Sequence, residues 1–584
     1  MRHKSTTWVS TLVAAIALFD PGARASTPAQ QQLKMLAERF VDQSLDYDPT
    51  LAYEAGLSTH IHDRFPDRRP AALGALDAAE RADLAAVVRL DTKALSDSSM
   101  ATYASLREKL ESDLQLRMCR TELWSVNHFL GWQSAFADVA EAQPVTTPEE
   151  RAQALRRWSS LPAYVDVEIA NLRRGLAAGY SAPKSVVRRV LRQINQMAAA
   201  AVENSPFFSP AARSDDLAFN AAFKQLITDE INPALQRYGD FLSETYLPKA
   251  REGIAISDLP NGPACYRALL RAQTTLDRPP EAVFQLGSRT VAANEAEVLR
   301  LGKQQFGTAD VAATLAAVHA RPEEHFKSKD ELLNFSRDFV TRASSLTAEH
   351  LISRMPQQNT IVEPERDFEE QAGVSSHLDP QPDISKPAVY RIELGNWSSQ
   401  TRAQAEIVVV HETLPGHHLQ IALARELMPP TRLGKLISNM GYQEGWARYA
   451  EGMAEEAGIY DTPDAAIMRR IWPARGMVVD PGLHAFHWTR EQAVQYLVST
   501  GWYTPESADD TVDRIAAMPA QLTAYDSGGL EIRALREEAR RRLGDRFDLK
   551  RFNTVVLEEG VVPLGELRRH VEAWLDSLTR ASTK

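Results

Sequence analysis

The sequence has few cysteines and no long charged or apolar run. Only Cys119 and Cys265 occur in 584 residues, which excludes a disulfide framework and a zinc site of four thiolates. Whether these two cysteines pair is left open. Lys and Arg total 66 against 77 Asp and Glu and form no basic tract, so nucleic acid is not expected as a partner. The hydrophobic content of 44% is ordinary for a globular protein and excludes disorder over most of the chain.

The apolar segment near the N-terminus is too short to span a membrane. Residues 8–19 form an uncharged run of 12, whereas a bilayer needs about 20 residues. Arg2 and Lys4 precede the run and Ala-Arg-Ala at 23–25 follows it, as in a signal peptide. We predict a signal peptide over residues 1–25 and an exported protein, periplasmic or secreted, without stable membrane insertion after cleavage. A buried N-terminal helix is the alternative. Since no cysteine follows the run, a lipid anchor is not expected.

Helix signals dominate the rest of the sequence. A capping-box pattern at 147–150 is typical of a helix start. The clearest strand is predicted over 388–394, an alternating run. The stretch 355–387 before it holds five prolines and is predicted to be a long irregular connection. We therefore predict a mainly α fold with a helical N-terminal part at 26–384 and a catalytic part at 385–584.

The stretch that carries chemistry reads His-Glu-Thr-Leu-Pro-Gly-His-His at residues 411–418. In the zinc hydrolase pattern His-Glu-x-x-His, two histidines on one helix face bind the metal and the Glu activates water. Here a proline stands in the second histidine's place. On a continuous helix His417 would point about 240° away from His411, and His418 would lie about 10.5 Å along the axis. The Pro-Gly pair is expected to break the helix, and a loop of two extra residues would bring His417 to the second ligand position.

A third ligand is expected on a later helix. Glu444 follows His417 by 27 residues, which lets one helix end and a second return beside it. Two His and one Glu form a known catalytic zinc set with a position open to water. Glu451, seven residues after Glu444, is the alternative ligand.

Three further residues are candidates for catalysis. Glu412 directly follows His411, in the position of the general base that takes a proton from water. The oxyanion that forms when water attacks a carbonyl needs a hydrogen-bond donor in addition to a metal. Tyr525, next to a flexible pair of glycines, is one candidate donor, and His484 is a second. Ordinary packing is the alternative for both.

Three other stretches add to the pattern. They read Gln-Glu-Gly-Trp-Ala-x-Tyr-x-Glu at 443–451, Asp-x-Gly-Leu-His-x-x-x-Trp at 480–488 and Tyr-x-x-Gly-x-x-x-Ile at 525–532. Together with 411–420 they resemble the bacterial domain-of-unknown-function family 885. The resemblance extends over residues 30–580, and the stretches within 411–451 are its most specific part.

This family is similar to largely helical zinc oligopeptidases and carboxypeptidases, which use His-Glu-x-Gly-His and a Glu on a later helix. The resemblance implies a helical zincin-like architecture with a deep central cleft and about one zinc ion per chain. The implied ligands are His411, His417 and Glu444. It also favours His417 over His418 and assigns the transition-state hydroxyl to Tyr525. The strand at 388–394 would be an edge strand that pairs with an extended peptide substrate.

The sequence therefore predicts an exported zinc metallopeptidase of oligopeptidase or carboxypeptidase type that cleaves short peptides, with Glu412 activating water. A metal-dependent hydrolase of a non-peptide amide or ester is one alternative, and a non-catalytic helical peptide-binding protein is another. The site of cleavage, the choice among zinc, cobalt and manganese, and the oligomeric state stay open. Candidates to bind a terminal charge of a peptide are Arg448, Arg475 and Arg533.

Overall fold

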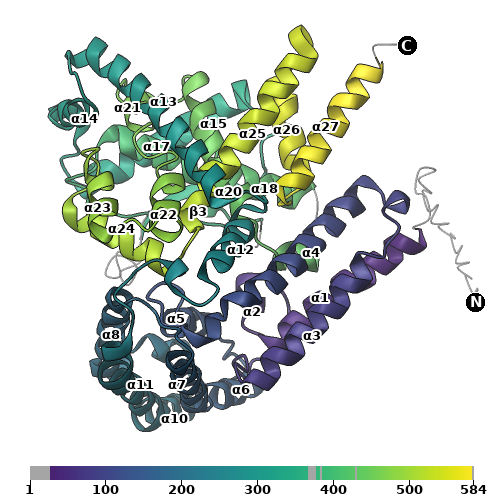
Figure 1. Ribbon diagram of the computed structural model, residues 1–584, viewed down its shortest axis with the longest axis vertical. Coiled ribbons are helices and arrows are strands. Elements are labelled where there is room, and N and C mark those ends of the chain that lie inside the picture. Colours follow the sequence, from purple (N-terminus) through teal and green to yellow (C-terminus); the bar gives the residue numbers. More distant parts are fainter. Residues whose placement is uncertain (1–26, 366–375, 382–383, 428–430, 582–584) are drawn as a thin grey trace, which may run out of the picture.

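The computed structural model describes residues 27–365, 376–381, 384–427 and 431–581. The predicted signal peptide lies outside these ranges. Helices make up most of the described chain, which confirms the mainly α class. Figure 1 shows two groups of helices, one from the N-terminal half and one from the C-terminal half. In the described ranges, no helix combines the length and the apolar character that a membrane span requires.

The first group joins a layer of long helices to a bundle of shorter ones (Figure 1). The capping box predicted at 147–150 is confirmed, because Thr147 Oγ1 accepts a hydrogen bond from the N–H of Glu150 at 3.2 Å. The helices of this group are α1 (Pro28–Tyr47), α2 (Leu51–Glu54), α3 (Pro70–Val87), α4 (Asp97–Leu116), α5 (Trp132–Ala142), α6 (Pro148–Ser159), α7 (Leu161–Ala177), α8 (Lys184–Ala199), α9 (Ser209–Ala212), α10 (Leu217–Leu226) and α11 (Asn232–Asp240).

The second group contains the stretches predicted to carry chemistry. Figure 1 shows α12 between the two groups and the later helices above it. The helices are α12 (Gly262–Thr274), α13 (Pro280–Phe306), α14 (Val311–His319), α15 (Lys329–His350), α17 (Arg402–Glu412), α18 (His417–Leu427), α19 (Arg432–Leu436), α20 (Met440–Glu456), α21 (Ala465–Met468), α22 (Gly476–His484), α23 (Arg490–Val498), α24 (Pro505–Ala517), α25 (Gln521–Leu543), α26 (Leu549–Glu558) and α27 (Leu564–Ala581).

One small sheet accompanies these helices in the described part of the chain. Its strands are β1 (Thr360–Pro364), β2 (His377–Asp379) and β3 (Ala388–Ile392), in the order β1-β3-β2. The strand predicted over 388–394 is confirmed as β3, but the prediction that it is an edge strand is wrong, because β1 pairs with it in parallel and β2 in antiparallel orientation. Both neighbours lie in the proline-rich stretch 355–387. Pro364 is the last residue of β1, where a missing N–H removes no central ladder bond.

The hydrophobic core around this sheet crosses the predicted domain boundary. The largest buried cluster combines side chains from α15, β1 and β3 with side chains from α17, α18, α20 and α25 to α27. The boundary near residue 385 falls between β2 and β3, inside the sheet. The two predicted parts, 26–384 and 385–584, therefore share this core.

Helices α20 and α25 approach each other backbone to backbone. A Cβ atom at Gly528 of α25 would lie 1.7 Å from the carbonyl oxygen of Gly441 in α20, so no side chain larger than hydrogen fits there. The glycine pair next to Tyr525, expected to be flexible, instead lies inside α25 and serves close packing. This contact places Tyr525 on the helix that packs directly against the helix of Glu444.

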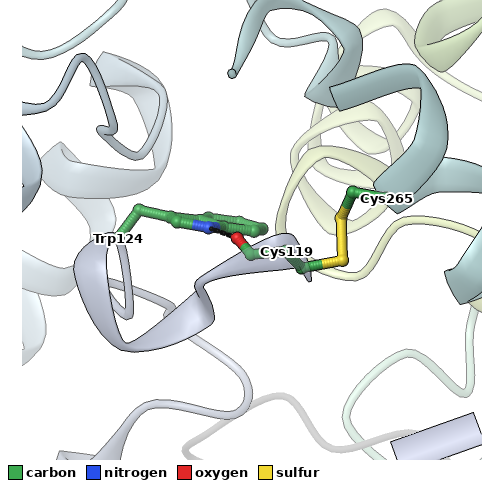
Figure 2. The surroundings of a disulfide bond; sticks show 3 residues. All are labelled: Cys119, Trp124 and Cys265. Carbon is green, nitrogen blue, oxygen red and sulfur yellow. Dashed lines mark hydrogen bonds between the residues drawn. A yellow bond between two sulfur atoms is a disulfide. The ribbon is translucent and has the colours of Figure 1, made fainter. Parts of the chain in front are cut away.

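Cys119 and Cys265 form a disulfide bond (Figure 2). Cys119 follows α4, Cys265 lies in the first turn of α12, and both are buried. The indole N–H of Trp124 donates a hydrogen bond to the carbonyl oxygen of Cys119 at 2.8 Å. The two cysteines are 146 residues apart in sequence, and the loop between them contains all helices from α5 to α11. The bond therefore ties the first helical group to α12.

Replacement of both cysteines by alanine should lower the free energy of unfolding by about 2–5 kcal/mol, because the cross-link no longer restricts the unfolded chain. Urea denaturation of the wild type with and without reductant, beside Cys119→Ala/Cys265→Ala, measures this effect. Reductant should lower the free energy of unfolding of the wild type to that of the variant. It should not change the free energy of unfolding of the variant. Equal stability of the oxidised wild type and the variant would contradict the prediction.

Candidate metal centre

Helix α17 places His411 and Glu412 at its C-terminal end. The helix begins with a capping box in which Thr401 Oγ1 accepts a hydrogen bond from the N–H of Gln404, and the Gln404 side chain accepts one from the N–H of Thr401. The preceding pair of valines, 409–410, is fully buried. Burial of these two side chains fixes the rotation of the helix, so that His411 and Glu412 emerge on its partly exposed side.

The Pro-Gly pair breaks the helix, as the sequence predicts. Helix α17 ends before the pair and α18 begins directly after it. A Cβ atom at Gly416 would lie 2.0 Å from the carbonyl oxygen of His411, so glycine is needed for a turn this tight. The indole nitrogen of Trp446, in α20, lies 2.9 Å from the carbonyl oxygen of Pro415 and 3.2 Å from that of Gly416. These contacts hold the turn that brings His417 back beside His411.

His411, His417 and Glu444 converge on one point. One ligand atom from each lies within 4.8 Å of the others, and no other such group of three His, Cys, Asp or Glu side chains occurs in the described ranges. Glu444 Oε2 lies 3.3 Å from His411 Nε2 and 3.5 Å from His417 Nε2. Two donors bound to zinc at about 2.0–2.1 Å with a tetrahedral angle are separated by about 3.3–3.4 Å. The donor types and their spacing therefore fit zinc.

The cluster is recessed but still reaches solvent. The three side chains each keep 13–15% of their surface exposed. Burial would raise the pKa of Glu444, but the hydrogen bonds and charges of His411 and His417 lower it well below its usual range. Glu444 therefore carries its negative charge, as a metal ligand requires.

The second ring nitrogen of His411 is bound to Glu451. His411 Nδ1 lies 2.9 Å from Glu451 Oε1, and Arg448 donates hydrogen bonds to both oxygens of that carboxylate at 2.8 Å. Burial would lower the pKa of His411, but the hydrogen bonds to Glu444 and Glu451 outweigh it and raise the pKa to about 10. A carboxylate on the far nitrogen of a metal-binding histidine orients the ring and increases its basicity. Glu451 thus contacts the far nitrogen of His411, and Glu444 is the carboxylate in the candidate ligand group.

Glu412 contacts the sheet. Its Oε2 atom accepts a hydrogen bond from the backbone N–H of Leu378, in β2, at 3.1 Å. This N–H points away from β3, because it is used outside the ladder, so the edge of β2 that does not pair with β3 faces Glu412. The negative charge of Glu412 also acts on His411. The candidate base therefore lies between the histidine cluster and a strand edge.

Tyr525 lies against His411. Its ring stacks on that of His411, with centroids 6.3 Å apart and planes 26° apart. The guanidinium of Arg448 lies 5.8 Å from the Tyr525 ring centroid, and Gln521 Nε2 donates to the phenolic oxygen at 3.4 Å. Burial raises the pKa of Tyr525, and the charge of Glu444 raises it further. The phenol therefore keeps its proton and can donate a hydrogen bond.

His418 is bound away from the cluster. Its Nε2 atom lies 2.8 Å from the carbonyl oxygen of Gln358, and its side chain is buried. The structure therefore brings His417, and not His418, to the other ligands.

His484 is not brought to the cluster either. Its Nδ1 accepts a hydrogen bond from the N–H of Ile256 at 3.1 Å, and its Nε2 lies 3.0 Å from the carbonyl oxygen of Ile515. Burial lowers the pKa of His484 to about 3, so the ring is neutral. Both ring nitrogens of His484 are thus engaged in hydrogen bonds with backbone atoms, and the residue connects two segments of the fold. The prediction that His484 donates a hydrogen bond to an oxyanion is therefore wrong. Arg475 is likewise buried, in an ion pair with Glu295 at 2.6 Å.

Replacement of Trp446 by phenylalanine should weaken zinc binding, because the buried carbonyl of Pro415 loses its donor and the turn that carries His417 loosens. We expect a loss of about 1–3 kcal/mol in the free energy of unfolding and a zinc affinity at least about tenfold lower. Urea denaturation and zinc titration against a chelator measure the two effects.

Trp124→Phe is the matched control for this variant. It also removes an indole hydrogen bond to a backbone carbonyl, but next to the disulfide bond. It should lower stability without changing zinc affinity. If both variants bind zinc as tightly as the wild type, Trp446 does not position the ligands.

Comparison with known proteins places the chain in a family. The model of a family described as a bacterial protein of unknown function (DUF885) matches residues 49–571. The chain belongs to this family. The match spans all the helices and strands that build the cluster of this DUF885 protein, so the resemblance predicted from the sequence is confirmed. No curated protein matches the chain.

Two solved structures share the fold of this DUF885 protein. One is the crystal structure of a candidate lipoprotein from Colwellia psychrerythraea, 24% identical, with a TM-score of 0.85 over 94% of this chain and 99% of that chain. The other is a candidate lipoprotein of unknown function from Shewanella oneidensis, 18% identical, with a TM-score of 0.76 over 92% of this chain and 99% of that chain. At these identities the likeness shows the fold alone.

Sequence reasoning missed the contacts that surround the ligands. Glu444 and Glu451 are seven residues apart, about two helical turns, so their side chains point to the same face of α20. That spacing was a usable signal for an outer partner of His411. No signal in the sequence pointed to Leu378, whose N–H reaches Glu412 from a strand far away along the chain.

Proposed function

We propose that this protein is an exported zinc-dependent metallopeptidase with a helical zincin-like architecture that hydrolyses short peptides. The observation that carries the proposal is the convergence of His411, His417 and Glu444. The contact of His411 Nδ1 with Glu451 supports it, because metal-binding histidines almost always have such an outer partner.

The residues of the cluster and its surroundings can supply the separate functions that peptide hydrolysis requires. A zinc ion held by His411, His417 and Glu444 would act as a Lewis acid and make water acidic enough to react near neutral pH. Glu412 accepts a hydrogen bond from the N–H of Leu378 on one oxygen. It can take the proton from the attacking water and later pass it to the leaving amine. Tyr525, whose phenol keeps its proton, can donate a hydrogen bond to the developing oxyanion.

The sheet favours a peptide as the substrate. The hydrogen bond from the N–H of Leu378 to Glu412 lies on the edge of β2 that does not pair with β3. An extended chain could add to such an edge through main-chain hydrogen bonds, which would hold a peptide bond near the general base. This edge belongs to β2 and replaces β3 as the predicted docking strand.

Two findings support export. Cys119 and Cys265 are paired, and structural disulfides persist in oxidising compartments outside the cytosol. Two solved structures with this fold are described as candidate lipoproteins, and lipoproteins are exported. Both agree with the signal peptide predicted over residues 1–25.

Metal content and a substrate panel test the proposal. Mass spectrometry of the purified mature protein, from Ser26, should find about one zinc per chain. A library of short peptides should then be cleaved, and cleavage should stop on metal removal and return with zinc. Turnover of arylamides or esters without any peptide would identify a non-peptide hydrolase. Tight peptide binding without turnover, with zinc present, would identify a binding protein. Absence of metal after incubation with zinc would refute both hydrolase functions.

A further inference from the structure

A cavity of about 110 Å³ lies behind His411, between α13, α20 and α25. Glu451 lines this cavity, whereas none of the three candidate metal ligands does. Glu451 contacts Nδ1 of His411, and Glu444 lies at Nε2, on the other side of the ring. The cavity is therefore separated from the candidate metal position by the His411 ring and Glu451.

The walls of the cavity carry an excess of positive charge. The charged residues that line it are Arg448, Arg469, Arg470, Arg533, Glu451 and Asp526. Arg448 is bound to Glu451 and lies 3.6 Å from Asp526. A further carboxylate, that of Glu455, pairs with both Arg469 and Arg470. Four guanidinium groups thus face three carboxylates.

Arg533 provides the unbalanced charge. Within the residues that the structure describes, its guanidinium has no ion pair or hydrogen bond. Its Nη2 atom would lie 3.1 Å from a Cβ atom at Gly452, so it extends along α20 towards the cavity. Desolvation and then the charge of Arg469 lower the pKa of Arg533, and together they outweigh the opposite effect of Glu456.

We propose that this cavity binds a small oxyanion, held by Arg533 and Arg469 together with Asn294 of α13, which also lines it. Guanidinium groups bind carboxylate and phosphate through paired N–H donors. The amide of Asn294 has no hydrogen bond to another described residue and can donate to the same ligand. The volume suits a few water molecules or one such anion.

The anion site is connected to the candidate metal centre through two contacts. Arg448 holds the carboxylate of Glu451, and Glu451 holds Nδ1 of His411. A bound anion adds negative charge beside Arg448 and weakens its hold on Glu451, which changes how strongly Glu451 acts on His411. This consequence rests on the proposed metal site, and linkage then requires that metal and anion alter each other's affinity.

Isothermal titration of the mature protein at constant ionic strength tests the anion site, with inorganic phosphate and acetate as separate ligands. We expect saturable binding of at least one of them at one site per chain. Preference for phosphate would identify a free inorganic oxyanion as the ligand, and preference for acetate the carboxylate of a small acid or peptide. Arg533→Gln and Asn294→Ala should each weaken binding, the former at least about tenfold.

Arg541→Gln is the matched control, because Arg541 is an exposed arginine on the same helix, outside the cavity. It should bind the anion as the wild type does. Absence of saturable binding up to 10-millimolar levels, about the weakest useful affinity, would overturn the proposal, as would equal binding by Arg533→Gln and Asn294→Ala. Zinc titrations with and without acetate check the coupling. If the protein binds the anion but no zinc, the anion site is supported and the proposed metallopeptidase function is refuted.

Discussion

Glu412→Gln should lower kcat/KM for the best peptide by a factor of about 10²–10⁴, the usual contribution of a general base. The glutamine side chain has the same shape and can still accept the hydrogen bond that Leu378 donates at 3.1 Å. It cannot accept a proton from water. Because Glu412 is outside the ligand group, the variant should retain its zinc. Steady-state kinetics and metal analysis of the same preparation measure both properties.

Glu406→Gln is the control for this variant, on the same helix. Glu406 accepts hydrogen bonds from Asp461 and Thr462, away from the cluster. Burial raises the pKa of Glu406 to about 7, so a neutral side chain is tolerated there. We expect Glu406→Gln to retain most of the activity. If Glu412→Gln is equally active while zinc is bound, another group activates the water.

His411→Ala, His417→Ala and Glu444→Ala should each yield protein with far less than one zinc per chain and no detectable turnover. Each variant removes one of only three protein donors, and a catalytic zinc site normally needs all three. The wild type should also melt at a lower temperature after metal removal, because a ligand at 1,000 times its Kd stabilises the folded state by about 4 kcal/mol. The three variants should show no response to a chelator.

His418→Gln is the control for the ligand variants. Glutamine can donate to the carbonyl of Gln358 in place of His418 Nε2, so the variant should fold and retain zinc. Loss of zinc in His418→Gln, together with its retention in His417→Ala, would assign the ligand to His418. Full zinc in all three ligand variants would place the metal elsewhere and refute the proposed centre.

The sequence was most informative where one short stretch contained both the candidate ligands and the residues that determine the local backbone conformation. Within 411–418 the Pro-Gly pair required a break, and a break could bring His417 to His411. The structure has that break, with Gly416 in a turn that no side chain would allow. Helix starts such as Thr147 could be predicted for the same reason, because a capping box is made of residues three apart.

Prediction was weakest where a residue's role depends on distant segments. From residue type and position alone, Tyr525 and His484 were both candidate donors, and only the family resemblance favoured Tyr525. Only the packing of α25 on α20 places Tyr525 against His411, and only the segments near Ile256 and Ile515 occupy both nitrogens of His484. The strands β1 and β2 were missed because the prolines of 355–387 predicted an irregular connection, whereas Pro364 lies at the end of β1 and Pro380 lies just after β2.

By itself, the amino-acid sequence determined the mainly helical class, the break after Glu412, the family, and the set of His411, His417 and Glu444 as candidate ligands. The helical class follows from helix signals along the whole chain, the family from its motif stretches, and the break and the candidate ligands from residue types and spacings within 411–444. The tertiary structure decided the pairing of Cys119 with Cys265, the outer role of Glu451, and the arginine-lined cavity behind the cluster. Each of these depends on side chains from separate helices meeting in space, and no local spacing in the chain specifies how those helices pack.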